Sequence, residues 1–275
     1  METSLTPFIP LADRIWTAIA EPETVTVGLI AGETGALVVD TGSTPAQGAA
    51  IREAAERTAG VPVVAVAVTH WHFDHFFGLA GFGGLPGYAH KSVAAWLERP
   101  ECADAAASLG LDVGGLARPT HTFALARTVD LGGRRAELVH FGPAHTDGDI
   151  VVIVPDAHVI FAGDMLERPH PSFEPESSLG GWPEALDGVL GATNEETILV
   201  PGHGAPMDRM VAFEQRGRIA ALESQAEYLA FRGIDAAHAL AEGEWPFPAE
   251  AIEPLLGRLY DGLTVRSAPT ASRNR

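Results

Sequence analysis

The sequence predicts an α/β fold in which two β-sheets are sandwiched between layers of helices. Strand and helix patterns alternate along the chain in two successive sets, with no low-complexity linker between them. Several strands are short, nearly continuous apolar runs, as expected for strands that are buried on both faces. Several of these runs end at a histidine or an aspartate in a loop shaped by glycine or proline. We therefore expect an αββα sandwich whose two halves both supply polar loops to one edge.

Each expected element rests on a local pattern of residues. The strands are β-rich or apolar runs bounded by turn residues, and one helix begins after Thr44, a predicted N-cap, with Pro45 at its first position. In the first half we expect strands over 25–30, 36–40, 61–68 and 88–90, and helices over 45–59 and 92–97. In the second half we expect strands over 136–141, 150–154, 159–162 and 197–200, and helices over 182–190 and 207–233.

The chain is expected to form one domain over residues 1–275. A helical C-terminal extension is predicted over about 207–263, after the last of the polar loops. The end of the chain, about 267–275, is predicted to be a disordered tail.

Composition and charge exclude several classes of function. The net charge is −18 and Lys91 is the only lysine, so the surface repels phosphate backbones and anionic lipids. Cys102 is the only cysteine, which excludes an intramolecular disulfide and a cysteine-based zinc site. The N-terminus lacks a signal-peptide pattern, and no stretch approaches the roughly 18 apolar residues of a membrane span. We expect a cytoplasmic protein with a small-molecule substrate, no nucleic-acid partner and no membrane partner, and the oligomeric state stays open.

The segment 70–75 has the pattern His-x-His-x-Asp-His and directly follows a buried apolar strand. In an extended loop, residues two apart project to the same side, so His70 and His72 can reach one metal ion together. Asp74 and His75 follow where the loop turns into a helix, so their side chains are expected to point toward a neighbouring metal.

Three further polar residues lie at the ends of other apolar strands: His145, Asp164 and His203. Together with the first cluster they make a set of imidazoles and carboxylates. Such nitrogen and oxygen ligands suit zinc, and also iron or manganese.

These motifs resemble the five ordered motifs of the metallo-β-lactamase superfamily, across roughly residues 25–205. The resemblance implies the αββα fold of that family and two metal ions, most simply two zinc ions. It assigns one metal to His70, His72 and His145, a second to Asp74, His75 and His203, and a bridging role to Asp164. Asp40, in Val38-Val39-Asp40-Thr41-Gly42, resembles the aspartate that supports the metal loop without binding metal.

The implied function is a dinuclear metal-dependent hydrolase in which a metal-bridging hydroxide attacks a carbonyl group. Asp74 is the predicted catalytic residue, because it is placed both to bind a metal and to orient the nucleophile. No Gly-x-Ser-x-Gly motif for a serine nucleophile occurs in the chain.

Some residues differ from those of individual branches of the family, and these differences narrow the range of substrates that the resemblance implies. Asp164 stands where antibiotic-resistance enzymes carry Cys or Ser, so the site resembles the glyoxalase-II-like branch, and the implied substrate is a thioester, ester or lactone. Three alternatives stay open: a polyketide-type thioesterase or cyclase, a β-lactam hydrolase, and a persulfide dioxygenase with one iron.

The predicted pocket residues are Glu167, His170 and Trp71. The loop 165–173 is expected to overhang the metals, and Glu167, where one lactamase subgroup has a lysine, would then disfavour substrates with a carboxylate beside the scissile carbonyl. The alternative for Glu167 is a solvent-facing side chain that pairs with an arginine. Trp71 is expected either in the pocket wall or in the core.

Overall fold

The strands form a mixed sheet that folds into two facing halves. The computed structural model describes residues 2–267. The strands are β1 (Ser4–Leu5), β2 (Ile9–Ala12), β3 (Ile15–Glu21), β4 (Val25–Ala31), β5 (Ala36–Val39), β6 (Val63–Ala67), β7 (Gly87–His90), β8 (His121–Phe123), β9 (Ala126–Asp130), β10 (Arg135–Val139), β11 (Val151–Val154), β12 (Val159–Glu167) and β13 (Ile198–His203). Their hydrogen-bonded order is β8-β7-β6-β5-β4-β13-β12-β11-β10-β9, with β3 also on β4, and β1 and β2 on β3.

The two halves meet at a narrow junction. Strands β4 and β13 share one register pair, His203 with Val25. The prediction of two separate sheets is corrected in this respect, because backbone hydrogen bonds across the junction make the sheet continuous. Within each half the strands that carry the site run parallel, β5 with β6 and β12 with β13. Their carboxyl ends therefore reach the same edge.

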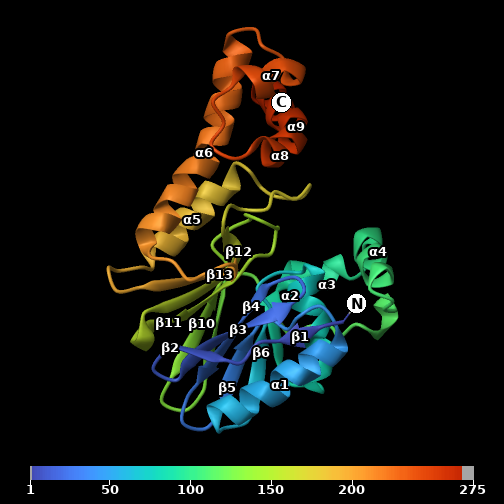
Figure 1. Ribbon diagram of the computed structural model, residues 1–275, viewed down its shortest axis with the longest axis vertical. Helices are drawn as coiled ribbons and strands as arrows, with labels where there is room; N and C mark the ends of the chain where they lie inside the picture. The colour runs from blue at the N-terminus through green and yellow to red at the C-terminus, as the bar shows by residue number, and fades with distance from the viewer. Residues whose placement is uncertain (1, 268–275) are drawn as a thin grey trace, which may run out of the picture.

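Helices cover the outer face of each half (Figure 1). The helices are α1 (Pro45–Ala59), α2 (Phe73–Phe76), α3 (Lys91–Trp96), α4 (Pro100–Ser108), α5 (Gly181–Gly191), α6 (Arg209–Phe231), α7 (Ala236–Glu242), α8 (Ala249–Ile252) and α9 (Leu256–Ser267). Short 3-10 turns cover Phe77–Phe82, Val113–Gly115, Pro155–Ala157 and Glu253–Leu255. The Thr44 side chain accepts the Gln47 N–H at the start of α1, which confirms the predicted cap.

Three apolar clusters fill the spaces between the layers. One lies between the two halves of the sheet and includes Leu37 and Ala65 of the first half and Phe161 and Val200 of the second. A second packs α1 against the first half, and a third packs α5 and α6 against the second. This order of helix, sheet, sheet and helix confirms the predicted αββα sandwich.

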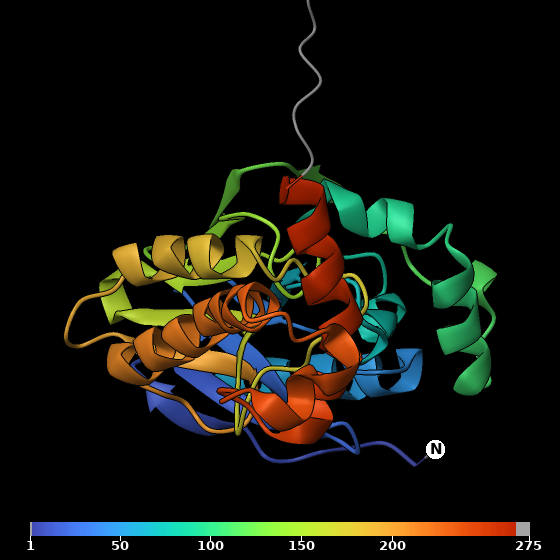
Figure 2. The ribbon, with the colours of Figure 1, turned by 90° about the horizontal axis from the view of Figure 1, so that it is seen from above.

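The C-terminal helices extend the second half of the molecule. Helix α6 lies beside α5, and α9 packs on α6 (Figure 2). The single-domain organisation stays a prediction, and the predicted tail over about 267–275 lies almost entirely outside the described residues. Within residues 2–267, the structure has no helix that combines the length and apolar character needed to cross a membrane.

Candidate metal centre

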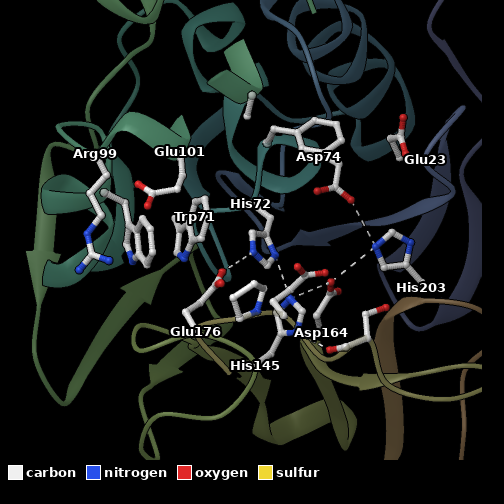
Figure 3. A pocket seen from close by; sticks show the side chains of 16 residues that line it. Glu23, Trp71, His72, Asp74, Arg99, Glu101, His145, Asp164, Glu176 and His203 are labelled. Atoms are coloured by element: carbon white, nitrogen blue, oxygen red, sulfur yellow. Dashed lines mark hydrogen bonds and ion pairs between the residues drawn. The ribbon is translucent and has the colours of Figure 1, made fainter. Parts of the chain in front are cut away.

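The carboxyl ends of four strands bring the predicted ligands together. His70 and His72 lie in the loop after β6, and Asp74 and His75 lie in the short helix α2. His145 lies in the loop between β10 and β11, whereas Asp164 and His203 belong to β12 and β13. Figure 3 shows His72, Asp74, His145, Asp164 and His203 converging from different elements on one hollow.

The first group joins three histidines and Asp164, with one candidate ligand atom of each residue within 4.8 Å of the others. His72 Nδ1 lies 3.0 Å from His70 Nε2 and 2.8 Å from His145 Nε2. Asp164 Oδ2 lies 3.7 Å from His70 Nε2 and 3.5 Å from His145 Nε2. The three ring nitrogens and a carboxylate oxygen therefore face a common centre.

The second group joins Asp74, His75 and His203, again within 4.8 Å. His203 Nε2 lies 3.3 Å from His75 Nε2 and 3.3 Å from Asp74 Oδ2. Asp164 also touches this group, since its Oδ1 lies 3.3 Å from His75 Nε2 and its Oδ2 lies 3.6 Å from His203 Nε2. Asp164 thus contacts both groups with its two oxygens.

Four of the five histidines have their outer ring nitrogen held by an oxygen acceptor. His75 Nδ1 lies 2.9 Å from Asp40 Oδ2, and His145 Nδ1 lies 3.0 Å from the Ser172 carbonyl oxygen. His72 Nε2 lies 3.0 Å from Glu176 Oε1. The pairs are completed by His70 Nδ1, which lies 3.1 Å from the Thr69 hydroxyl. When these outer nitrogens carry the proton, the inner nitrogens are free to act as ligands.

Asp40 organises this outer layer from a strained backbone position. It is buried and has a positive φ of 64°. Its carboxylate accepts the Thr69 N–H at 2.8 Å, the Thr69 hydroxyl at 2.9 Å and the His75 ring nitrogen at 2.9 Å. A non-glycine residue in this region of φ costs free energy, which the surrounding hydrogen bonds offset.

The site combines buried neutral histidines with several carboxylates, whose mutual repulsion a bound cation would reduce. Burial lowers the pKa of His70 well below its usual value and lowers that of His145 to about 4, so both rings are neutral at neutral pH. Burial alone would also lower the pKa of His75, but the Asp164, Asp74 and Asp40 carboxylates outweigh it and raise that pKa well above its usual value.

The donor set fits a metal ion. His72 Nδ1 lies at hydrogen-bond distance from the inner nitrogens of His70 and His145, and these two neutral rings, with protonated outer nitrogens, offer only lone pairs there. Asp164 Oδ1 is buried and has no hydrogen-bond partner in the described structure. Divalent cations between these atoms would satisfy the lone pairs and the carboxylate together.

A pocket of about 690 Å³ opens over the two groups. Trp71 lines it and is 8% exposed, so it belongs to both the wall and the packed interior. Its ring stacks on Trp96 with centroids 3.9 Å apart, and the Arg99 guanidinium lies 3.7 Å from the Trp96 ring. Successive ring contacts thus join His72, Trp71, Trp96 and Arg99 in a row, of which Figure 3 labels His72, Trp71 and Arg99.

The positions predicted for Glu167 and His170 are corrected by the structure. Both line a separate hollow beside α6 and not the pocket over the candidate ligands. Glu167 is buried in β12, because pairing with β13 continues past Asp164 to the register pair of Glu167 with His203. Its carboxylate accepts the Ser172 N–H and hydroxyl, each at 2.8 Å, so the solvent-facing alternative is also wrong.

Several residues of the site have no signal in the motifs. Asp149 is buried and accepts three hydrogen bonds from the His145 loop, two from Thr146 at 2.7 and 2.9 Å and one from the Ala144 N–H at 3.2 Å. Glu174 and Glu176 enter the pocket from the loop before α5. The run Thr146-Asp147-Gly148-Asp149 is a local turn signal, whereas Glu176 lies 104 positions from the histidine that it contacts.

Comparison with known proteins identifies the family. The sequence model described as "Metallo-beta-lactamase superfamily" matches residues 20–210, and the chain belongs to this superfamily. It is 30% identical over 138 residues to "Metallo-beta-lactamase type 2" of Bacteroides fragilis, a match covering 49% of this chain and 51% of that protein. It is 26% identical over 164 residues to "Probable metallo-hydrolase YqgX" of Bacillus subtilis, covering 57% and 75%. The chain therefore spans about half of the length of the Bacteroides relative.

Solved structures share the fold. A metallo-beta-lactamase from Pontibacter korlensis superposes with a TM-score of 0.64 at 20% identity, covering 79% of this chain and 99% of that one. The metallo-beta-lactamase FIM-1 from Pseudomonas aeruginosa, solved in a mono-zinc form, gives 0.63 at 20% identity, covering 79% and 95%. These likenesses support the αββα architecture, and the superfamily match together with the two His/Asp groups identifies a metallo-hydrolase scaffold.

Proposed function

We propose that this protein is a dinuclear, zinc-dependent hydrolase that cleaves an ester, thioester or lactone of a small molecule. The observation that carries the proposal is the position of Asp164 between two complete ligand groups. One of its oxygens lies within 3.7 Å of His70, His145 and His203, and the other lies 3.3 Å from His75.

Two ions would be held by the side chains that already face each group. The first would bind His70, His72 and His145, the second Asp74, His75 and His203, and Asp164 would bridge them. When bound, such ions polarise a carbonyl oxygen and lower the pKa of a coordinated water molecule to near neutral pH.

The protein's own residues position the reacting groups. Asp74 is buried, and its Oδ2 lies 3.3 Å from His203 Nε2 and 3.5 Å from His75 Nε2, at the pocket side of the second group. A carboxylate there can hold a water proton and orient the water oxygen toward a substrate in the pocket. Trp71 and Phe73 supply an apolar wall that restricts water around the substrate.

A β-lactam substrate is the second candidate, because the Bacteroides relative carries that activity in its name. The lining of this pocket argues against it. Among the described residues that line the pocket, only Arg99 has a fixed positive charge, and its guanidinium stacks on Trp96. A β-lactam carries a carboxylate beside the scissile bond, and several carboxylates already face the pocket. We therefore rank neutral carbonyl substrates first.

The test is a panel of four substrates assayed with the same protein: phenyl acetate, S-phenyl thioacetate, a γ-lactone and a chromogenic cephalosporin. We expect turnover of an ester, thioester or lactone that stops when EDTA removes the metal and returns with added zinc. Turnover that survives EDTA, or that is equal in an Asp74→Asn variant, would refute the proposed mechanism. Fast cleavage of the cephalosporin alone would make the second candidate correct.

A further inference from the structure

The pocket over the candidate metal centre carries an unusual excess of carboxylates. Within residues 2–267, six acidic side chains line this pocket, and Arg99 supplies the single guanidinium. The acidic residues are Glu23, Asp74, Glu101, Asp164, Glu174 and Glu176. Two divalent ions and Arg99 would contribute a charge of +5, so the six carboxylates leave the pocket at −1 even when the metals are bound.

Three of these carboxylates neither belong to the proposed ligand groups nor contact a ligand side chain. Asp74 and Asp164 belong to the ligand groups, and Glu176 holds His72 at 3.0 Å. By contrast, the side chains of Glu23, Glu101 and Glu174 have no hydrogen-bond or ion-pair partner among residues 2–267. Burial raises the pKa of Glu174, and the nearby His72 ring offsets this shift only in part.

The three unpaired carboxylates come from separate parts of the fold. Glu23 lies in the turn between β3 and β4, Glu101 in α4, and Glu174 in the loop that leads to α5. Figure 3 shows Glu23 and Glu101 on opposite sides of the candidate ligands. A cleft with low-dielectric walls and charges of one sign focuses the field on its interior and attracts ligands of the opposite sign.

We infer that the substrate of the proposed hydrolase carries a cationic group, such as an ammonium, away from its scissile carbonyl. The inference rests on the proposed function for the reacting end of the substrate. The Glu23, Glu101 and Glu174 carboxylates bind the cationic end through charge, and the apolar wall of Trp71 and Phe73 contacts the carbon skeleton. Carboxylates and phosphates on the substrate are disfavoured for the same reason.

The experiment compares three thioesters of equal acyl group: cationic acetylthiocholine, its neutral 3,3-dimethylbutyl isostere, and the anionic S-acetyl-3-mercaptopropanesulfonate. We expect kcat/KM to fall in that order. In the triple variant Glu23→Gln, Glu101→Gln, Glu174→Gln, the cationic-to-neutral ratio should fall about tenfold at low ionic strength, and less in 1 M salt. A control triple, Glu242→Gln, Glu244→Gln, Glu250→Gln, changes the net charge equally at exposed positions outside the pocket.

A binding measurement separates this inference from the proposed function. Calorimetry with benzyltrimethylammonium should show tighter binding to the wild type and control than to the pocket triple, whether or not any thioester is cleaved. Binding without hydrolysis would refute the function and leave the charge selection standing. Hydrolysis with no preference among the thioesters, or an equal loss in both triples, would overturn the charge selection.

A second and independent observation concerns the outer face of helix α6. Four large apolar side chains are exposed there: Phe231 at 91%, Met210 at 66%, Phe213 at 59% and Tyr228 at 54%. Between them lie the exposed small residues Gly217, Ala221 and Ser224. Successive members are three or four positions apart, so all seven lie on one face of the helix, here named the α6 stripe.

The α6 stripe has nearly the same order of large and small side chains from either end of the helix. Met210 and Phe213 at one end mirror Phe231 and Tyr228 at the other, and the small residues lie in the middle. In two antiparallel copies of α6, Met210 would meet Phe231, Phe213 would meet Tyr228, and small residues would meet small residues. That arrangement allows two helix backbones to approach closely about a twofold axis.

The exposed apolar area suits a modest dimer. The four large side chains offer roughly 500 Å² per copy, and two copies would bury about 1,000 Å², near the lower limit for a specific interface. The largest exposed apolar patch of a typical monomer has about this size and is often functional. The structure assigns the α6 stripe to a twofold dimer of this chain.

Gly217→Glu tests this interface without disturbing the monomer. A Cβ atom at Gly217 meets nothing within 4 Å, and glycine weakens a helix interior relative to other residues. Sedimentation velocity at 100 µM should show a dimer for the wild type and a monomer for Gly217→Glu, with no loss of thermal stability. Gly257→Glu, on α9 with equally open space, is the matched control and should stay dimeric. A monomeric wild type, or a dimeric Gly217→Glu, would overturn the proposal.

Discussion

The substitution Gly202→Ala tests the bridging role of Asp164 by a steric change at a residue that binds nothing itself. Gly202 lies in β13 between Pro201 and His203. A Cβ atom placed on it would lie 1.8 Å from Asp164 Oδ1 and 2.9 Å from the Gly163 carbonyl carbon. The backbone at Gly202 lies outside the positive-φ region, so alanine adds this contact without a conformational penalty of its own.

The size of the clash sets the expected effect. Ordinary contacts of a Cβ atom begin near 3.4 Å, so the Asp164 carboxylate and the added methyl group must separate by more than 1 Å. Metal–ligand distances tolerate only about 0.2 Å, and a displacement near 1 Å at a reacting centre can cost a factor of about 100 in rate. We expect kcat/KM to fall by roughly 10²-fold and the variant to lose at least one of two metal ions.

The assay combines metal analysis, hydrolysis kinetics and thermal unfolding of the same preparation. Gly257→Ala is the control, because a Cβ atom there meets nothing within 4 Å. The control should keep wild-type metal content and turnover. Full metal content and normal turnover in Gly202→Ala would show that Asp164 does not hold two ions at once.

Three further predictions concern individual side chains. Asp74→Asn keeps the size of the side chain but removes its charge, so kcat should fall on the order of 10²-fold with an unchanged circular dichroism spectrum; near-normal turnover would remove Asp74 from the mechanism. Asp40→Asn replaces one acceptor oxygen by an amide, so metal affinity, measured by competition with a chelator, should weaken by roughly 10–100-fold. An unchanged affinity would mean that Asp40 supports only the fold. Burial and, second, the stacked ring of His140 lower the pKa of His90 to about 4. Because this folded-state pKa lies below the unfolded value near 6.5, folding stability is lost as pH falls from about 6.5 toward 4. Urea unfolding at pH 7 and pH 5 should show the wild type losing on the order of 2 kcal/mol more than His90→Phe, and equal losses would contradict the assignment.

Local patterns were sufficient to predict the elements that carry the site. The apolar run before His70 forms β6, and the Thr44 cap and Pro45 start α1 as predicted. The weakly marked strands were missed. In β3, Ile15–Glu21, alanine and threonine interrupt the apolar alternation, and β8 and β9 are mostly exposed strands without an apolar run. Their conformation depends on pairing with neighbouring strands, which a local pattern does not record.

The metal-ligand candidates were predictable because motif and strand position coincide for each of them. The seven residues meet at one edge because the carboxyl ends of neighbouring strands meet there. The supporting residues depend on tertiary contacts between distant segments, as Glu176 with His72 illustrates. Glu167 was misplaced because the prediction ended its strand at residue 162, whereas pairing with β13 carries β12 to Glu167 itself. The negative charge that the sequence analysis placed in the pocket through Glu167 is supplied instead by Glu23, Glu101 and Glu174.

The metal-to-protein ratio of the chain purified without chelator tests the central claim most directly. Two complete groups that share Asp164 predict a ratio close to two per chain, mainly zinc, by inductively coupled plasma mass spectrometry. A ratio near one, with iron as the metal and oxygen consumed on addition of a persulfide, would contradict the dinuclear hydrolase and favour a mononuclear dioxygenase.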